Sequence, residues 1–385
     1  MKFKVMTVFG TRPEAIKMAP VVLELQKHGD KIDTIVAVTA QHREMLDQVL
    51  GLFKIKPDYD LDIMAQGQTL YDITARALLG LRDIMEKEKP DIVLVHGDTT
   101  TTFSGALAAY YQQIPVGHVE AGLRTGDIYS PFPEEMNRKL TGAITAFHFS
   151  PTSSAKENLL RENVPADHIY VTGNTVIDAL VKTVKAEYIF DNKMLQHIDY
   201  DHQRVILVTT HRRENLGEPM RHVYRALRRI VMEYPDVEIV FPVHKNPLVR
   251  KVVTEELEKI DRVHLIDPLD YEPFVNLIAR SALVLTDSGG IQEEAPSLGK
   301  PVLVLRSTTE RPEAVTAGTV KLIGTDESAV YEETRRLLAD PAAYATMSNA
   351  VNPYGDGLAS KRIVTTLLQV FAHEPIIADS FVAQR

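Results

Sequence analysis

The sequence contains no cysteine, has no long apolar run, and carries fewer basic than acidic residues. Without cysteine, a disulfide framework and thiolate chemistry are both excluded. The N-terminal MKFKVMTVFG leads directly into a strand-like pattern, and no apolar run approaches the roughly 18 residues needed to cross a bilayer. We therefore expect a cytoplasmic protein.

Positive charge is also scarce. The 43 Lys and Arg residues are outnumbered by 52 Asp and Glu residues, which gives a formal net charge of −9. This balance argues against a nonspecific nucleic-acid binder or a basic membrane-surface protein, so an anionic ligand would have to be held by local cations. With 385 residues, of which 44% are hydrophobic and 25% charged, the chain is long enough for two globular domains.

Two common cofactor signatures are missing as well. The first predicted strand is followed by GTRPE at Gly10–Glu14 rather than by G-x-G-x-x-G, which argues against NAD chemistry. The spaced histidines do not form H-E-x-x-H or a similar metal pattern. We therefore expect no cofactor and no catalytic metal. The histidines concerned are His96, His118, His211, His244 and His264.

Short β-branched runs alternate with amphipathic segments of helical period, which is typical of βα units and parallel sheets. The sequence predicts an α/β protein with two doubly wound domains, residues 1–173 and 174–359, divided within the segment 173–192. A final helix over 360–373 could pack back on the first domain. Strands are predicted at 4–9, 34–39, 92–96, 116–120, 148–150, 169–172, 205–210, 237–242, 263–266, 283–286 and 302–305, and helices include 15–26, 102–111 and 134–145.

Polar residues follow the strands of the first half. In open α/β sheets ligands bind beyond the carboxyl ends of the strands, and two such domains face to face would enclose a cleft. Arg12 and Lys17 could clamp an anion there, while Asp98, Glu120 and Glu134 would reach one rim. Taken alone, Asp98 could be only an N-cap, and Glu134 could only complement the helix dipole. Together they favour proton transfer, because carboxylates sharing a cleft raise each other's pKa.

The second half supplies groups suited to a diphosphate. LTDSGGIQEEAP, at 285–296, places a Ser-Gly-Gly turn before a helix, where backbone N–H groups can bind phosphate and Glu294 can accept hydrogen bonds from a ribose diol. Locally this could be an ordinary strand-to-helix turn. The basic HRREN turn after 205–210 and Arg311 fit a phosphate partner, although local Arg to Glu pairing would also explain HRREN. The combination indicates a nucleotide-diphosphate site.

Taken in order, GTRPEAIKMAP, HGDTTTT, HVEAGLRT, FPEEMNR, HRREN, PVHKNP, DSGGIQEEAP, TERPE and NPYGDG resemble the motifs of the non-hydrolysing bacterial UDP-N-acetylglucosamine 2-epimerases. The resemblance covers nearly the whole chain. It implies a GT-B fold of two Rossmann-like domains and a usually dimeric cytoplasmic enzyme that needs no NAD. Such enzymes interconvert UDP-N-acetylglucosamine and UDP-N-acetylmannosamine, the latter for cell-surface polysaccharide synthesis.

The resemblance also implies roles for individual residues. Bacterial members are activated by a second UDP-N-acetylglucosamine bound beside the active site, and Glu44 and Gly67 stand where some members have Gln and Arg, which bears on effector affinity. The catalytic positions correspond to Asp98, Glu120, Glu134 and His211; the UDP-contacting positions to Arg12, Lys17, Phe274, Ser288, Gly289, Gly290, Glu294 and Arg311; and the effector positions to Gln41, Glu134, Arg212 and His244.

Three rival functions remain open from the sequence. A GT-B glycosyltransferase would share the glycine turn and the ribose Glu but would need an acceptor pocket and only one base. A hydrolysing epimerase would release free N-acetylmannosamine and UDP. A nucleotide-sugar sensor would bind without turnover, although it would have no need of Asp98, Glu120, Glu134 and His211.

Overall fold

The computed structural model describes residues 2–41, 43–375 and 378–383, and the chain divides into two compact units. The first unit contains the chain up to Val181 and returns from Tyr354 to Val382, and the second contains Lys182–Pro353. The division expected after residue 173 lies before helix α7 (Thr175–Thr183), whereas the structure keeps most of that helix in the first unit. Within the described ranges, no helix is both long and apolar enough to cross a membrane.

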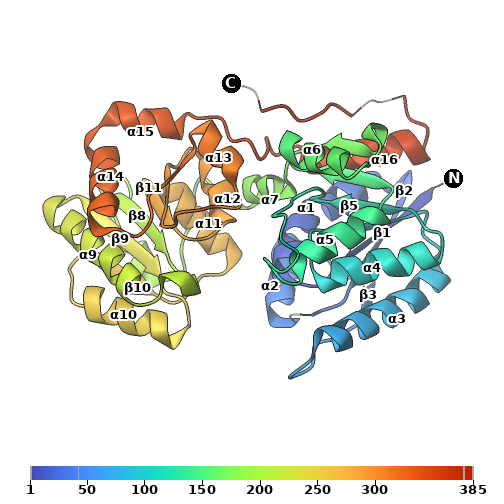
Figure 1. The fold of residues 1–385 in the computed structure, drawn as a ribbon, viewed down its shortest axis with the longest axis horizontal. Coiled ribbons are helices and arrows are strands. Elements are labelled where there is room, and N and C mark those ends of the chain that lie inside the picture. Colours follow the sequence, from blue (N-terminus) through green and yellow to red (C-terminus); the bar gives the residue numbers. More distant parts are fainter. Residues whose placement is uncertain (1, 42, 376–377, 384–385) are drawn as a thin grey trace. The chain divides into compact units, whose positions relative to one another are not determined.

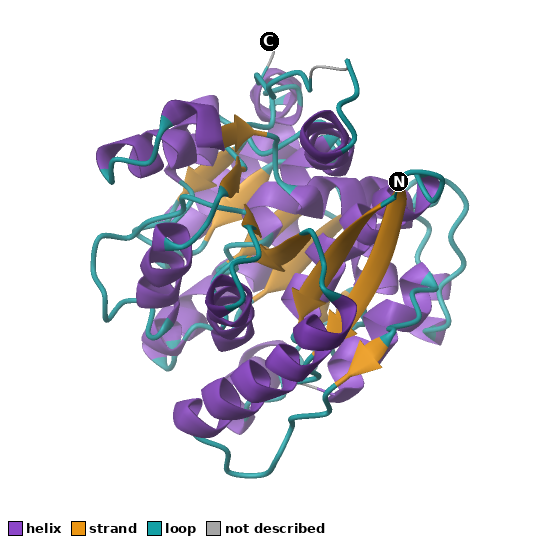
Figure 2. Cartoon of the chain, turned by 90° about the vertical axis from the view of Figure 1, so that its right-hand side faces the viewer, coloured by secondary structure: helices purple, strands orange, loops and turns teal. Residues whose placement is uncertain are grey.

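The first unit is built on a seven-stranded parallel sheet in the order β3-β2-β1-β4-β5-β6-β7. Helices pack around the strands (Figures 1 and 2). Its central strands are apolar on both faces because helices cover them, as in other doubly wound sheets. The elements are β1 (Phe3–Phe9), α1 (Arg12–Lys27), β2 (Ile32–Val38), α2 (Arg43–Phe53), β3 (Tyr59–Asp60), α3 (Leu70–Glu88), β4 (Ile92–His96), α4 (Thr100–Tyr111), β5 (Val116–Val119), α5 (Glu134–Ala143), β6 (Phe147–Ser150), α6 (Ser153–Arg161), η1 (Ala166–His168), β7 (Ile169–Val171), α7 and α16 (Ala359–Phe371).

The second unit repeats the arrangement with six parallel strands in the order β10-β9-β8-β11-β12-β13. Strands β8, β9 and β11 and helix α9 supply most of its apolar core. The elements are α8 (Lys193–Gln196), β8 (Arg204–Thr209), η2 (Arg213–Asn215), α9 (Glu218–Glu233), β9 (Val237–Pro242), α10 (Pro247–Leu257), β10 (Val263–Ile266), α11 (Tyr271–Arg280), β11 (Leu283–Thr286), α12 (Ile291–Ser297), β12 (Val302–Val304), α13 (Pro312–Ala317), β13 (Val320–Leu322), α14 (Glu327–Ala339) and α15 (Pro341–Ser348).

The prediction of two α/β domains with parallel sheets is confirmed, and every strand expected from the sequence is present within one or two residues. Strands β3 and β13 were not expected. Both are very short and lie at sheet edges, so neither has the extended apolar run by which a buried strand is recognised. Glu120, expected as the last residue of a strand, lies just beyond β5 with a φ of 66°.

The last helix completes the first unit. Helix α16 packs against α1, and the ring of Phe371 stacks on that of Phe3 with centroids 5.3 Å apart. The buried carboxylate of Asp178 in α7 accepts hydrogen bonds from the backbone N–H groups of Ala359 (3.1 Å) and Ser360 (2.8 Å). These bonds satisfy N–H groups at the start of α16 that have no partner within the helix.

Three histidines of the first sheet are buried in its interior. His96 ends β4, while His118 and His148 are register partners on β5 and β6. Burial lowers the pKa of His96 and of His118 to about 4 and the pKa of His148 to about 3. The folded protein therefore holds all three rings neutral at pH values where a solvated histidine, with a pKa near about 6.5, is already charged.

This difference predicts acid destabilisation. Below about pH 6.5 the histidines of the unfolded chain bind protons, whereas the folded rings stay neutral down to about pH 4. The free energy of unfolding therefore falls as pH falls, by up to about 1.4 kcal/mol per pH unit for each histidine. We expect His148→Leu to make this slope shallower between pH 6 and 4.5, as measured by urea denaturation. His202→Leu should leave the slope unchanged, because its side chain is 83% exposed. Equal slopes in the wild type and His148→Leu would contradict the expectation.

Candidate active site

In each unit, several of the polar residues singled out by the sequence lie at the point where the strand order reverses. That point falls between β1 and β4 in the first sheet and between β8 and β11 in the second. Loops leave the carboxyl ends of such neighbouring strands in opposite directions and open a crevice for a ligand. Gly10 and Asp98 follow β1 and β4, and His211 and Ser288 follow β8 and β11.

A buried carboxylate fixes the first of these turns. Glu14, one turn into α1, accepts hydrogen bonds from the backbone N–H groups of Gly10 (3.1 Å) and Thr11 (2.8 Å) and from the hydroxyls of Thr99 (2.7 Å) and Thr102 (3.1 Å). Burial raises the pKa of Glu14, and these hydrogen bonds partly oppose it. Glu14 thus joins the loop after β1 to the loop after β4. At Gly10 a side chain would collide with the hydroxyl of Thr39, so only glycine fits there.

Glu120 lies at the centre of the polar groups in the first unit. Lys17 forms an ion pair with its Oε1, and the amide Nδ2 of Asn174 donates to the same oxygen at 2.9 Å. The Nε2 of His96 lies 3.6 Å from its Oε2. A positive φ is uncommon for a residue with a Cβ and is kept where the surroundings determine it. The structure thus holds this carboxylate from α1, from β4 and from the segment before α7.

Asp98 and Glu134 are brought together through helix α5. Arg138 donates to the carboxylate of Asp98 at 2.6 Å, and Asn137 donates to the backbone carbonyl of Asp98 at 2.9 Å. Glu134 begins the same helix, one turn before Arg138, so it lies on the same face. Among the residues that the structure describes, the buried Oε2 of Glu134 has no hydrogen-bond partner. The carboxylates expected at one rim therefore lie on neighbouring elements of one sheet edge.

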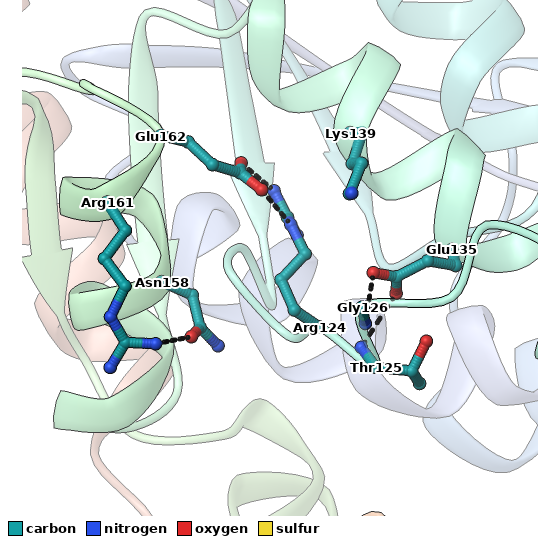
Figure 3. A pocket seen from close by; sticks show the side chains of 8 residues that line it. All are labelled: Arg124, Thr125, Gly126, Glu135, Lys139, Asn158, Arg161 and Glu162. Atoms are coloured by element: carbon teal, nitrogen blue, oxygen red, sulfur yellow. Dashed lines mark hydrogen bonds and ion pairs between the residues drawn. The ribbon is translucent and has the colours of Figure 1, made fainter.

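The loop that leads from Glu120 to α5 is anchored by ionic contacts (Figure 3). Glu135 accepts hydrogen bonds from the backbone N–H groups of Thr125 and Gly126, both at 3.1 Å. Arg138 also donates to Glu135, at 2.9 Å. Arg124 reaches in the other direction and makes two hydrogen bonds to Glu162, of 2.8 and 2.7 Å. Residues Arg124–Gly126, Glu135 and Glu162 line a pocket of about 380 Å³. The anchors fix the chain directly after the Glu120 turn.

In the second unit a buried aspartate organises the basic turn after β8. Asp287 accepts hydrogen bonds from the backbone N–H groups of His211 and Arg212, both at 2.9 Å, and its Oδ1 lies 2.7 Å from the Nδ1 of His211. Burial raises the pKa of Asp287, but the hydrogen bonds from His211 and the backbone outweigh it and hold the pKa below its ordinary value. The imidazole of His211 is therefore oriented through Nδ1.

The effector residues predicted in the second unit lie beside this turn. The rings of His211 and His244 stack with centroids 5.9 Å apart, and the Nε of Arg212 donates to the backbone carbonyl of Asp287 at 3.2 Å. In the first unit, Gln41 accepts a hydrogen bond from Thr101 at 3.2 Å. Glu44 is exposed at the start of α2, and Gly67 has a φ of 73°.

The residues predicted to contact UDP occupy several elements. In the second unit the glycine turn precedes α12, and a Cβ built on Gly290 would meet no atom of the described residues within 4 Å. The carboxylate of Glu294 accepts from Tyr271 at 2.9 Å, and Arg311 forms an ion pair with Glu293. Phe274 lies in α11, half-buried. In the first unit, Arg12 begins α1 and Lys17 lies one turn further along, paired with Glu120.

Several residues that shape these sites were not identified from the sequence. Asn174 contacts Glu120, Arg138 pairs with Asp98, Asp287 orients His211, and Glu14 joins two loops. Glu14, Arg138 and Asp287 lie inside motifs already quoted, whereas Asn174 lies outside all of them. An acid at the end of a buried strand, as in LTDSGG, was the one local signal that could have pointed to Asp287.

Comparisons with known proteins agree with this geometry. The family model described as UDP-N-acetylglucosamine 2-epimerase matches residues 23–368. The chain is 61% identical over 380 residues to the UDP-N-acetylglucosamine 2-epimerase of Bacillus subtilis, covering 99% of both chains.

Solved structures give the same result. A Listeria monocytogenes protein assigned as a UDP-N-acetylglucosamine 2-epimerase matches with a TM-score of 0.94 and 52% identity, over 99% of this chain and 100% of that one. The Neisseria meningitidis UDP-GlcNAc 2-epimerase bound to UDP-GlcNAc matches with a TM-score of 0.86 and 55% identity, over 95% and 100%.

A glycosyltransferase of kitacinnamycin shares only the fold, with a TM-score of 0.64 at 13% identity. With two parallel-sheet domains of the same strand order, these likenesses confirm the expected GT-B fold. The chain belongs to the UDP-N-acetylglucosamine 2-epimerase family and is, like its members, an isomerase.

Proposed function

We propose that this epimerase interconverts UDP-N-acetylglucosamine and UDP-N-acetylmannosamine without net hydrolysis, by eliminating UDP to form a 2-acetamidoglucal and adding it back. The observation that carries the proposal is the group of three carboxylates, Asp98, Glu120 and Glu134, at one sheet edge, two of them paired with cations. The N. meningitidis relative bound to UDP-GlcNAc supports the substrate class.

Elimination explains why the site needs several acids. The proton on C2 of the sugar is not acidic, because no neighbouring carbonyl can hold the charge left by its removal. If the C1–O bond to UDP breaks as the C2 proton leaves, the electron pair of the C2–H bond becomes the C1–C2 double bond and UDP takes the electrons of the C1–O bond. Return of a proton to the opposite face of C2, with UDP adding to C1, gives the epimer.

Asp98, Glu120 and Glu134 are proposed as the groups that exchange these protons and stabilise positive charge at C1. Reaction at both faces of C2 requires proton-transfer groups on two sides, and the first unit supplies carboxylates from three different segments. Lys17 forms an ion pair with Glu120, and Arg138 forms one with Asp98. Which acid serves which face is left open in the proposal.

The leaving diphosphate needs fixed cations and N–H dipoles rather than a proton. We assign these roles to Arg12, His211, Arg311 and the turn Ser288–Gly290, with Glu294 on the ribose and Phe274 near the uracil. Support comes from the open space at Gly290 and from the orientation of His211 by Asp287. Lys17, proposed for UDP contact, is near enough to Glu120 to link the leaving group with the acid.

We also propose that UDP-N-acetylglucosamine binds a second, activating site that includes Gln41, Glu134, Arg212 and His244. Because His244 stacks on His211, an effector bound to His244 would lie beside the proposed catalytic histidine.

We further propose a cytoplasmic homodimer. Large apolar side chains on the packed helices α3 and α4 support it, since Tyr71, Leu79, Tyr110 and Tyr111 are each more than half exposed.

A glycosyltransferase is the nearest competing function, because the fold is shared. It would leave UDP-N-acetylglucosamine unchanged when no acceptor is present. A hydrolysing epimerase would instead release free N-acetylmannosamine and UDP.

The isotope test of the proposal uses heavy water. When UDP-N-acetylglucosamine is incubated with the protein in D₂O, we expect deuterium at C2 of both nucleotide sugars, because the proton removed exchanges with solvent before a proton returns. Proton NMR measures this as loss of the C2 signal. Deuterium in neither sugar, or a mixture of free sugar and UDP as the main products, would contradict the proposed reaction.

Substitution tests the carboxylates separately from binding. Asp98→Asn and Glu120→Gln should lower kcat by about 10² to 10⁴-fold, the usual contribution of a general acid or base, while UDP affinity stays within about three-fold. Glu157→Gln, which changes an exposed carboxylate with 63% side-chain exposure, is the matched control and should leave both unchanged. If Asp98→Asn and Glu120→Gln lose UDP binding instead, these residues act in substrate recognition rather than in proton transfer.

Effector control gives a third expectation. Starting from pure UDP-N-acetylmannosamine, the reaction should show a lag that a trace of UDP-N-acetylglucosamine removes, because the activator is then supplied from the start. His244→Ala should weaken this activation more than it changes the rate at saturating UDP-N-acetylglucosamine. Progress curves followed by NMR measure both quantities, and linear curves without a lag would exclude an activating site.

A further inference from the structure

His96 is a polar residue at the end of an otherwise apolar strand. Residues Ile92–Val95 of β4 are apolar and buried, and the side chain of His96 is only 3% exposed. Within the described part of the chain, neither ring nitrogen of His96 has a hydrogen-bond partner. Its Nε2 lies 3.6 Å from Oε2 of Glu120.

An imidazole in this position is not explained by packing. Buried polar atoms in folded proteins are nearly always hydrogen-bonded, and an apolar side chain would fill the same space without an unmet donor. The distance to Glu120 exceeds a normal hydrogen bond of about 3.2 Å by only a few tenths of an ångström. A small rotation of either side chain would therefore complete the bond.

The charges around Glu120 favour a neutral donor at this position. Lys17 already provides a positive charge, and Asn174 donates to Oε1 without charge. Burial lowers the pKa of His96 to about 4, and Lys17 also lowers it, while Glu120 opposes both. At neutral pH the ring therefore carries one N–H and no charge. On the Oε2 side, a Cβ built on Gly97 would come within 3.5 Å of that oxygen, so the backbone of β4 passes close to the carboxylate.

We propose that His96 is a positioning residue for Glu120, donating a hydrogen bond from Nε2 to Oε2 of the carboxylate as the sugar reacts. The bond stabilises the ionised carboxylate and fixes its direction against C2. The proposal rests on the proposed role of Glu120 in proton transfer. His96 itself exchanges no proton with the sugar.

The test compares one variant that removes the donor with one that replaces it. His96→Leu should lower kcat for UDP-N-acetylglucosamine by about 10 to 100-fold, with KM and UDP affinity within about three-fold, and move the acidic limb of the kcat against pH profile up by about one unit. His96→Gln, whose amide can donate from nearly the position of Nε2, should recover most of kcat and the original profile. His148→Leu removes an equally buried imidazole from β6 and should leave kcat unchanged.

Unfolding of each variant is followed by circular dichroism, so that loss of folded protein is separated from loss of rate. The proposal is overturned if His96→Leu keeps wild-type kcat and pH profile, if His96→Gln recovers nothing, or if His148→Leu loses as much. Glu120→Gln in the same assay distinguishes failure of this proposal from failure of the proposed function. If Glu120→Gln is active, Glu120 does not have its proposed role in proton transfer. If Glu120→Gln is inactive and His96→Leu is fully active, only the role of His96 is refuted.

Discussion

The ion pair between Lys17 and Glu120 is the contact on which the first unit's site depends. A carboxylate with only 8% side-chain exposure is costly to ionise unless a cation or hydrogen-bond donors accompany it. Lys17 provides that cation from the first turns of α1, and Glu14 holds the start of the same helix against the loop after β4. The position of Glu120 therefore depends on the helix that also presents Arg12. Lys17, which the family resemblance assigns to UDP contact, thus also supports the acid proposed for proton transfer.

In the second unit the acid and the base exchange roles, because a carboxylate there fixes basic residues. His211 and Arg212 follow strand β8 in sequence, and both are only partly buried. Asp287 accepts hydrogen bonds from both backbone N–H groups and from the imidazole, and it lies at the end of the neighbouring strand β11. The reversal of strand order thus serves each unit in the same way, because it places a charged side chain beside a partner from an adjacent strand end.

Much of this arrangement could be predicted because it is local in sequence. Apolar runs of strand length identified both sheets, and the residues that follow each run identified Asp98, Glu120, His211 and the glycine turn. The partners could not be found in the same way. Asn174 is 54 residues from Glu120, and the contact depends on strands β5, β6 and β7 lying in this order in one sheet. The roles of UDP-contacting and effector residues came from the family resemblance, since no local pattern distinguishes a phosphate-binding arginine from one paired with a neighbouring acid.

The three acids of the first unit are not equivalent, and their surroundings suggest different tasks. Glu120 and Asp98 each have a cation in contact, so their charge is compensated before substrate binds. Glu134 lies at the start of α5, where the helix N-terminus favours negative charge, and within the described residues its buried Oε2 still lacks a donor. A sugar hydroxyl or amide could supply that donor. Substrate binding would then satisfy Glu134 as well, and a site of this kind gains its full set of hydrogen bonds only when the sugar is present.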